Sequence, residues 1–208
     1  IFNVTMQNHS SYAQGWNNLE KTVTLSTEQR TADTTAEQYL ALMRASDDAL
    51  RDLITHYERS SEPTMIVFFG DHQPSLSSSF YPNLNGKGLS GLTEDELEDL
   101  YTIPFFIWTN YESTEVELPV TSINYLSTLA LERAGIELPA YNQFLADLME
   151  TIPAINSRGY YSKSAGGFLH IEEATGEEAA WIRNYNILQY NNMFDKKEKS
   201  EVFFPYLE

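Results

Sequence analysis

The sequence predicts an α/β fold in which helices flank a mostly parallel sheet. Two apolar runs, residues 65–69 (MIVFF) and 103–108 (IPFFIW), are too short for helices and are typical of strands buried on both faces. Ahead of the first run, residues 36–57 show the three-and-four spacing of apolar side chains that marks one face of a helix. A strand, a helix and a second strand form a βαβ unit, whose two strands lie parallel.

The first strand of this unit is expected at residues 1–6 (IFNVTM), which are rich in β-branched and aromatic side chains. Polar residues 7–18 end it. The long helix at 36–57 ends ahead of Pro63, because proline is disfavoured inside a helix. The strand at 65–69 completes the unit.

The rest of the chain alternates loops and helices. Residues 73–102 are expected to be mostly loop, with a short helix that begins at a capping box of Thr93 and Glu96. Three further helices are expected at 122–134, 140–152 and around 177–190. Gly135 and Pro153 follow the first two of these helices and end them.

We expect a single domain over 1–208. Its α/β part, 1–135, carries the candidate site residues, and its part at 136–208 is mainly helical. The chain starts with Ile1 and not with Met, inside a strand pattern, so we expect a fragment or processed product of a longer protein.

The composition excludes some classes of function. The chain has 13 basic and 30 acidic residues and a net charge of −17, which disfavours binding to nucleic acid. It has no cysteine, and therefore neither disulfides nor thiolate metal ligands. No apolar run approaches the roughly 18 residues that a membrane-spanning helix needs.

Asp71 and His72 follow the strand at 65–69 and are the main candidates for chemistry. Ligands of α/β sheets bind beyond the carboxyl ends of the strands. Gly70 is expected to let the chain turn so that both side chains face one ion. A carboxylate with an imidazole suits Mn²⁺, Zn²⁺ or Fe²⁺. We favour this interpretation over a capping Asp beside a packed His.

Other polar residues are weaker candidates. His9 lies just past the expected first strand, whereas Asp47 lies on the apolar face of the long helix, where a structural hydrogen bond is expected. His56 is interpreted as structural, and His170 is not assigned to a site. Two ligands are too few for a catalytic metal, so the missing ligands are expected upstream of Ile1.

Six segments, in this order, resemble the C-terminal half of the lipoteichoic acid synthase family. They are NVTMQNHSSY, YLALMRASDDALRDLI, VFFGDHQP, IPFFIWTNY, TSINYLSTLALERAGIELP and YNILQYNNMF. That family comprises sulfatase-like phosphoglycerol transferases of the alkaline phosphatase superfamily. The resemblance covers about 2–194, and GDHQP is its most specific part. It implies the C-terminal part of an alkaline-phosphatase-like catalytic domain.

The resemblance also implies roles for three residues. Asp71 and His72 correspond to ligands of a divalent metal, commonly Mn²⁺, with Mg²⁺ or Zn²⁺ also open, and His9 corresponds to a residue that binds the phosphate or glycerol group of the substrate. The family's nucleophilic threonine and its metal-binding glutamate lie on earlier segments. Thr5 does not replace that threonine, because it lies inside the expected strand. The chain therefore has no predicted catalytic nucleophile.

The implied activity is transfer of glycerolphosphate from a phosphatidylglycerol-type lipid to a polymer or glycan acceptor, at the extracellular face of a bacterial membrane. An upstream segment would attach the protein to the membrane, and this chain alone would be inactive. An unpaired sheet edge could also cause self-association. The alternatives are another member of the superfamily (sulfatase, phosphodiesterase or phosphoethanolamine transferase) and a non-catalytic binding or structural domain.

Overall fold

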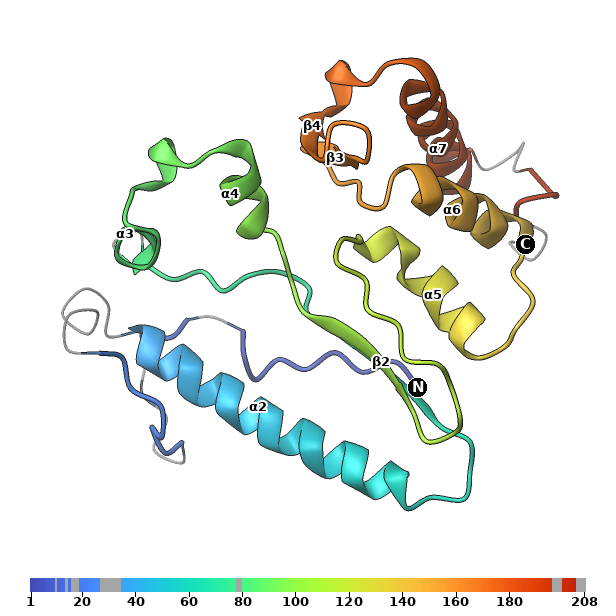
Figure 1. Ribbon diagram of the computed structural model, residues 1–208. Helices are drawn as coiled ribbons and strands as arrows, with labels where there is room; N and C mark the ends of the chain where they lie inside the picture. The colour runs from blue at the N-terminus through green and yellow to red at the C-terminus, as the bar shows by residue number, and fades with distance from the viewer. Residues whose placement is uncertain are drawn as a thin grey trace. The chain divides into compact units, whose positions relative to one another are not determined.

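The computed structural model describes residues 1–9, 11–13, 15, 19–26, 35–77, 80–195 and 200–204. They form two compact units, Ile1–Tyr111 and Glu112–Glu208 (Figure 1). Both units combine helices with a two-stranded antiparallel sheet. The predicted α/β class is confirmed, and the single-domain organisation stays a prediction. Among the described residues, none of the helices is both long and apolar enough to span a membrane.

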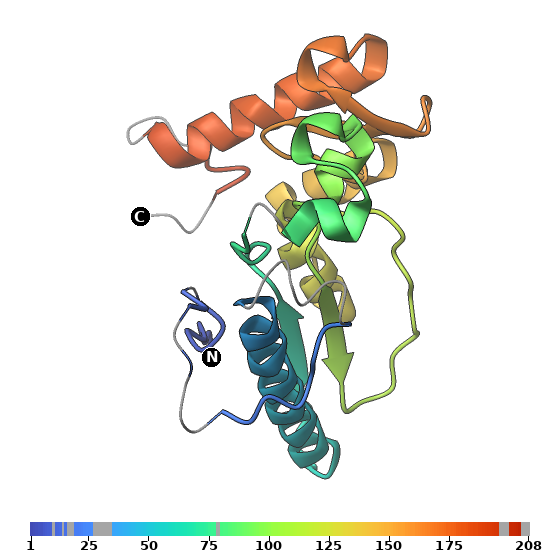
Figure 2. The ribbon, with the colours of Figure 1, turned by 90° about the vertical axis from the view of Figure 1, so that its left-hand side faces the viewer.

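The first unit is built on helix α2, Thr35–Glu58, and on strands β1, Met65–Phe69, and β2, Phe105–Thr109. The helix predicted at 36–57 and both apolar strands are confirmed. In two perpendicular views, α2 runs alongside the pair of strands (Figures 1 and 2). The buried side chains of α2 lie in its first half: Ala36, Gln38, Ala41 and Leu42.

Strands β1 and β2 pair antiparallel, with Met65 opposite Thr109 and Phe69 opposite Phe105. The rings of Phe68 and Phe106 stack across the pair, with centroids 5.3 Å apart. Every residue of both strands is half-buried. The described pair is antiparallel, a direction that the apolar runs do not indicate, because such a run shows that a strand is buried but not which way it runs.

The strand predicted at residues 1–6 is not formed in the structure. This segment has no regular secondary structure and is exposed, and Phe2 retains 80% of its accessible surface. A β-branched sequence becomes a strand only where a neighbour supplies hydrogen bonds, and within the described residues this segment joins neither sheet. The βαβ unit expected from the sequence is therefore absent from the described part of the chain.

Asn110, directly after β2, joins three parts of the first unit. Its backbone N–H donates to Thr64 O at 3.1 Å, and its side-chain Oδ1 accepts from Thr64 N at 2.7 Å. Its Nδ2 donates to Tyr57 O at 3.0 Å and to Glu62 O at 2.9 Å. One side chain thus fixes the end of α2, the turn that follows it and the start of β1.

Between β1 and β2 the chain forms three short helices: α3, Phe80–Asn85; η1, Leu89–Gly91; and α4, Glu94–Asp99. The predicted capping box at the start of α4 is confirmed. Thr93 N donates to Glu96 Oε2 at 2.7 Å, and Glu96 N donates to Thr93 Oγ1 at 3.3 Å. The capping box thus gives acceptors to two backbone N–H groups at the N-terminus of α4, those of Thr93 and Glu96.

The second unit contains helices and a β-hairpin. Its elements are η2, Ile123–Tyr125; α5, Leu126–Arg133; α6, Ala140–Thr151; β3, Gly159–Ser162; β4, Gly167–His170; η3, Ile171–Glu173; and α7, Gly176–Phe194. The three predicted helices are confirmed, and Gly135 has the positive φ of 68° that ends α5. The hairpin was not predicted, because each of its strands has only four residues.

Buried hydroxyl groups join the hairpin and the helices of this unit. Tyr125 and Tyr160 are fully buried members of the core cluster. The Tyr125 hydroxyl donates to Ile152 O at 2.6 Å, and the Tyr160 hydroxyl donates to Glu178 Oε2 at 2.9 Å. Burial is the main cause that raises the pKa of Tyr160 to about 12, and the Glu178 carboxylate adds to it.

We expect the free energy of unfolding to fall as the pH rises from about 10 to about 12, because unfolded tyrosine loses its proton near pH 10. In this range the folded chain keeps the Tyr160 proton that the unfolded chain has lost, so alkali favours unfolding. Urea unfolding at several alkaline pH values measures how steeply the free energy of unfolding falls with pH. Tyr160→Phe should make this dependence shallower, and an unchanged dependence would contradict the raised pKa of Tyr160.

Replacement of Gly159 by alanine is expected to destabilise the second unit. A Cβ atom at this position would overlap the backbone oxygen of Leu169 on the facing strand. Overpacking of this kind typically costs about 1–3 kcal/mol. Gly88→Ala is the control, because a Cβ there meets no atom within 4 Å and the φ of −70° suits any residue. Equal unfolding midpoints for the two variants would refute this account of the hairpin.

Candidate metal and substrate site

Asp71 and His72 lie in the loop that directly follows β1, as the sequence predicts. Both side chains reach solvent, with 79% of the Asp71 side chain and 65% of the His72 side chain exposed. The distance between Asp71 Oδ2 and His72 Nε2 is 3.7 Å. A carboxylate oxygen and an imidazole nitrogen therefore lie side by side on an accessible loop.

This loop is attached to the chain segment that leads into β2. Gly70 N donates to Pro104 O at 3.1 Å, and Gln73 Nε2 donates to Thr102 O. Within the loop, His72 N donates to Asp71 Oδ1 at 2.9 Å. Because β2 is paired with β1, these bonds hold the two candidate ligands at a defined edge of the sheet.

The imidazole of His72 is oriented by its neighbour. Its Nδ1 lies 2.8 Å from Gln73 O. A carbonyl oxygen only accepts hydrogen bonds, so Nδ1 carries the proton and Nε2 of the neutral ring keeps its lone pair. Histidine ligands of metals typically show this pattern, in which the second ring nitrogen donates to a carbonyl or carboxylate.

The geometry fits two ligands of a divalent cation. Metal–ligand distances are roughly 2.1 Å, so one ion could contact two atoms that lie 3.7 Å apart. The set is incomplete, however. Across the described part of the chain, His, Asp and Glu side chains form no group of three or more that could hold a metal ion. The loop thus supplies part of a site.

Gly70 is not required for the turn, contrary to the sequence-based expectation. Its backbone lies outside the left-handed region that favours glycine. A Cβ atom on Gly70 would lie 3.4 Å from Ile103 Cβ, which is close to ordinary van der Waals contact. The hydrogen bonds to Pro104 and Thr102 explain the course of the loop instead.

His9 lies on a second loop, which contacts helix α2. The side chain of Asn8 accepts from Ser46 Oγ at 3.1 Å and donates to Met43 Sδ at 3.4 Å. The Tyr12 hydroxyl donates to Asn8 O at 2.8 Å. His9 itself is exposed. Asn8 therefore fixes the position of the loop, while the imidazole of His9 reaches solvent.

Three tyrosines lie near the two candidate loops. The ring of Tyr12 meets that of Tyr39 on α2 edge-on, at 5.3 Å between centroids. Tyr81 donates to Pro74 O at 2.9 Å, just after the Asp71–His72 loop. Burial raises the pKa of Tyr12, and Tyr81 lies near enough to raise it further. Sequence reasoning missed this cluster, because only Tyr39 follows a helical pattern.

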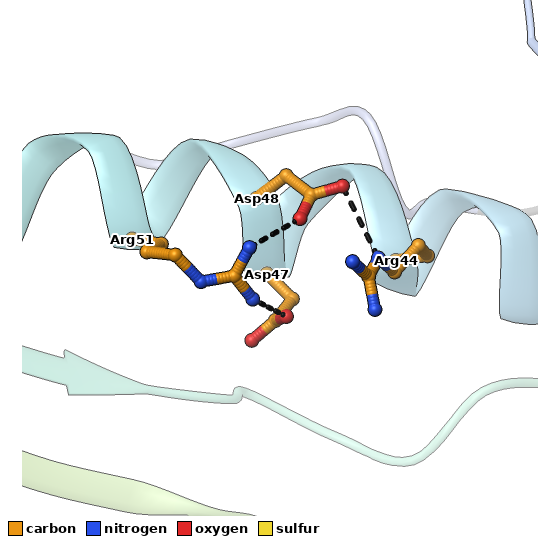
Figure 3. A network of polar contacts seen from close by, with 4 residues as sticks. All are labelled: Arg44, Asp47, Asp48 and Arg51. Atoms are coloured by element: carbon orange, nitrogen blue, oxygen red, sulfur yellow. Dashed lines mark hydrogen bonds and ion pairs between the residues drawn. The ribbon is translucent and has the colours of Figure 1, made fainter.

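Within the described part of the chain, Asp47 bonds to no distant loop, and it does not lie on a buried face. Its side chain is 59% exposed and contacts Arg51 of the same helix, with Oδ2 and Nη2 2.7 Å apart. Arg51 also contacts Asp48 at 2.7 Å, and Arg44 contacts Asp48 at 3.2 Å (Figure 3). The guanidinium groups, that of Arg51 first, lower the pKa of Asp48. Such exposed ion pairs add little to stability.

The two remaining histidines lie on α2 and at the end of β4. His56 lies in the last turn of α2, and its ring meets that of Tyr57 edge-on at 5.0 Å. His170 is the last residue of β4, in the second unit, and its backbone N–H donates to Glu173 Oε2 at 2.8 Å. Their observed contacts are local, as expected for His56.

Comparison with known proteins points to one family. The sequence model of the Sulfatase family matches residues 1–136. A protein of Rhizobium meliloti (strain 1021), whose name assigns it to cyclic beta-1,2-glucan modification, is 24% identical over 217 residues. That match covers 98% of this chain and 32% of the relative.

A solved structure has a similar fold. The phosphoglycerol transferase GacH of Streptococcus pyogenes, in complex with sn-glycerol-1-phosphate, matches with a TM-score of 0.58 and 20% identity. The match covers 90% of this chain and 42% of GacH. The chain thus spans less than half the length of both proteins. The sulfatase-like fold predicted from the sequence is confirmed, and because the family model covers more than half of the residues, the chain belongs to the sulfatase family.

Proposed function

We propose that the protein containing this chain is a metal-dependent phosphoglycerol transferase. It would move glycerolphosphate from a phosphatidylglycerol-type lipid to a polymer or glycan acceptor. The observation that carries the proposal is the Asp71–His72 pair, with Nε2 and Oδ2 3.7 Å apart at the end of β1. Membership of the sulfatase family and the fold similarity to a phosphoglycerol transferase support it.

Asp71 and His72 would hold a divalent ion, for which we propose Mn²⁺, with Mg²⁺ and Zn²⁺ as the alternatives. When bound, such an ion supplies positive charge that stabilises the oxygens of a reacting phosphoryl group. His72 is prepared for this role, because Gln73 O holds its Nδ1 proton and leaves Nε2 available. Asp71 adds a negative charge that attracts the cation.

His9 would bind the phosphate or glycerol group of the substrate. An exposed imidazole can donate hydrogen bonds to phosphate oxygens, and near neutral pH it can also accept or return a proton. Its loop is attached to α2 through Asn8. Tyr12 donates to Asn8 O beside His9, and Tyr81 donates to Pro74 O just after the Asp71–His72 loop.

We place the nucleophilic threonine and the remaining metal ligands in parts of the protein outside this chain. The threonine oxygen would attack phosphorus and displace the diacylglycerol alkoxide, which takes up a proton. A hydroxyl group of the acceptor would then lose its proton and displace the threonine oxygen from phosphorus. We do not propose Thr5 as the nucleophile, because it is exposed and belongs to none of the described helices.

We further propose that the site faces the outside of a bacterial membrane, where the donor lipid lies. A segment outside this chain would attach the protein to that membrane. The name of the rhizobial relative, which concerns a cyclic glucan, supports a glycan as acceptor. Self-association of the isolated chain through an open edge of the β1–β2 pair is a further proposal.

Loss of the proposed ligands is expected to remove the metal. In the full-length protein, Asp71→Ala with His72→Ala should abolish high-affinity binding of Mn²⁺, measured by titration and by elemental analysis of purified protein. The matched control is Asp52→Ala with His56→Ala, which removes the same two side-chain types from the exposed surface of α2. Equal metal content in the two double variants and the unchanged protein would eliminate the proposed site.

This chain alone is expected to show no turnover of a fluorescent phosphatidylglycerol, because it lacks a nucleophile. The full-length protein should release fluorescent diacylglycerol and transfer glycerolphosphate to an added acceptor. Turnover by the isolated chain would contradict the proposal that the nucleophile lies outside this chain. Cleavage of a sulfate ester without lipid turnover by the full-length protein would instead favour a sulfatase.

A further inference from the structure

We propose that Gln73 is a positioning residue of the metal site, one that selects the tautomer of His72. The inference rests on the proposed function, in which His72 Nε2 binds the ion. The backbone and the side chain of Gln73 contact different partners. Its backbone oxygen accepts from His72 Nδ1 at 2.8 Å, and its side-chain Nε2 donates to Thr102 O.

The side-chain bond determines which way the carbonyl of Gln73 faces. Asp71, His72 and Gln73 are all exposed, so packing does little to fix this part of the loop. The bond to Thr102 ties Gln73 to the segment that precedes β2, 29 residues away in sequence. While this hydrogen bond is formed, the carbonyl of Gln73 stays beside the imidazole of His72.

The tautomer matters because only one form of the neutral ring can bind a metal through Nε2. A proton on Nδ1 leaves a lone pair on Nε2, whereas a proton on Nε2 removes it. If the carbonyl of Gln73 turned away, both forms would be populated. Metal binding would then have to select one of them, which weakens the affinity.

The bond to Thr102 is not needed to align the strands. Five residue pairs already set the register of β1 and β2. The bond from Gly70 N to Pro104 O closes the end of the pair next to the site, and Asn110 holds the opposite end. The side chain of Gln73 therefore acts on the loop beyond the sheet, where the candidate ligands lie.

The test is Gln73→Met in the full-length protein, because methionine has a similar length and no N–H donor. We expect the dissociation constant for Mn²⁺ to rise by about tenfold or more, the range typical of groups that orient metal ligands. In metal-free protein with ¹⁵N-labelled histidine at alkaline pH, the His72 signals should change from the Nδ1–H tautomer to a mixture. The melting temperature should stay the same.

Gln143→Met is the matched control, because Gln143 Nε2 donates to Leu138 O at 2.7 Å in the second unit. It should change neither the affinity for Mn²⁺ nor the His72 signals. Gln73→Lys, which keeps a side-chain donor, should retain the Nδ1–H tautomer. If Gln73→Lys keeps the His72 signals of the unchanged protein, the effect of Gln73→Met comes from the lost hydrogen bond and not from another consequence of the substitution.

Two failures can be told apart. Unchanged affinity and unchanged His72 signals in Gln73→Met would overturn the role of Gln73, provided that Asp71→Ala with His72→Ala still loses Mn²⁺. Retention of Mn²⁺ by that double variant would instead overturn the proposed metal site itself. A weaker affinity with an unchanged tautomer would also count against Gln73, because it would show an effect that does not pass through His72.

Discussion

The clamp formed by Asn110 is the interaction on which the arrangement of the first unit depends. Its backbone and side chain together bond to Thr64, at the start of β1, and to the carbonyl groups of Tyr57 and Glu62, at and after the end of α2. Buried or partly buried backbone groups need such partners. By joining the helix, the turn and both strands, the clamp fixes where β1 begins, and the register of the strand pair carries that position to the end of β1.

The chemistry then follows from short-range contacts within and around two loops. Asp71 and His72 are neighbours in sequence, so their proximity costs little conformational entropy, and hydrogen bonds to Thr102 and Pro104 attach their loop to β2. The loop of His9 reaches α2 through Asn8. Tyr12 and Tyr81 donate to backbone oxygens of these two segments, Asn8 O and Pro74 O.

Much of this could be predicted from the sequence, for physical reasons. Helical periodicity and capping residues are local signals, so α2, α4 and α6 were found. The parallel pair expected between residues 1–6 and 65–69 is not formed among the described residues, because strand pairing depends on distant residues. The hairpin at β3 and β4 was missed because its strands are short. The Asp71–His72 pair was recognised as a motif, whereas the contacts of the Gln73 and Asn110 side chains depend on tertiary structure and left no pattern.

The central claim is that Asp71 and His72 bind a divalent cation through Oδ2 and Nε2. Anomalous diffraction at the manganese edge, from crystals of the full-length protein grown with Mn²⁺, tests it most directly. The account predicts a peak within about 2.3 Å of both atoms, with His72 Nδ1 still bonded to Gln73 O. A manganese ion bound elsewhere, or bound to His72 through Nδ1, would contradict it.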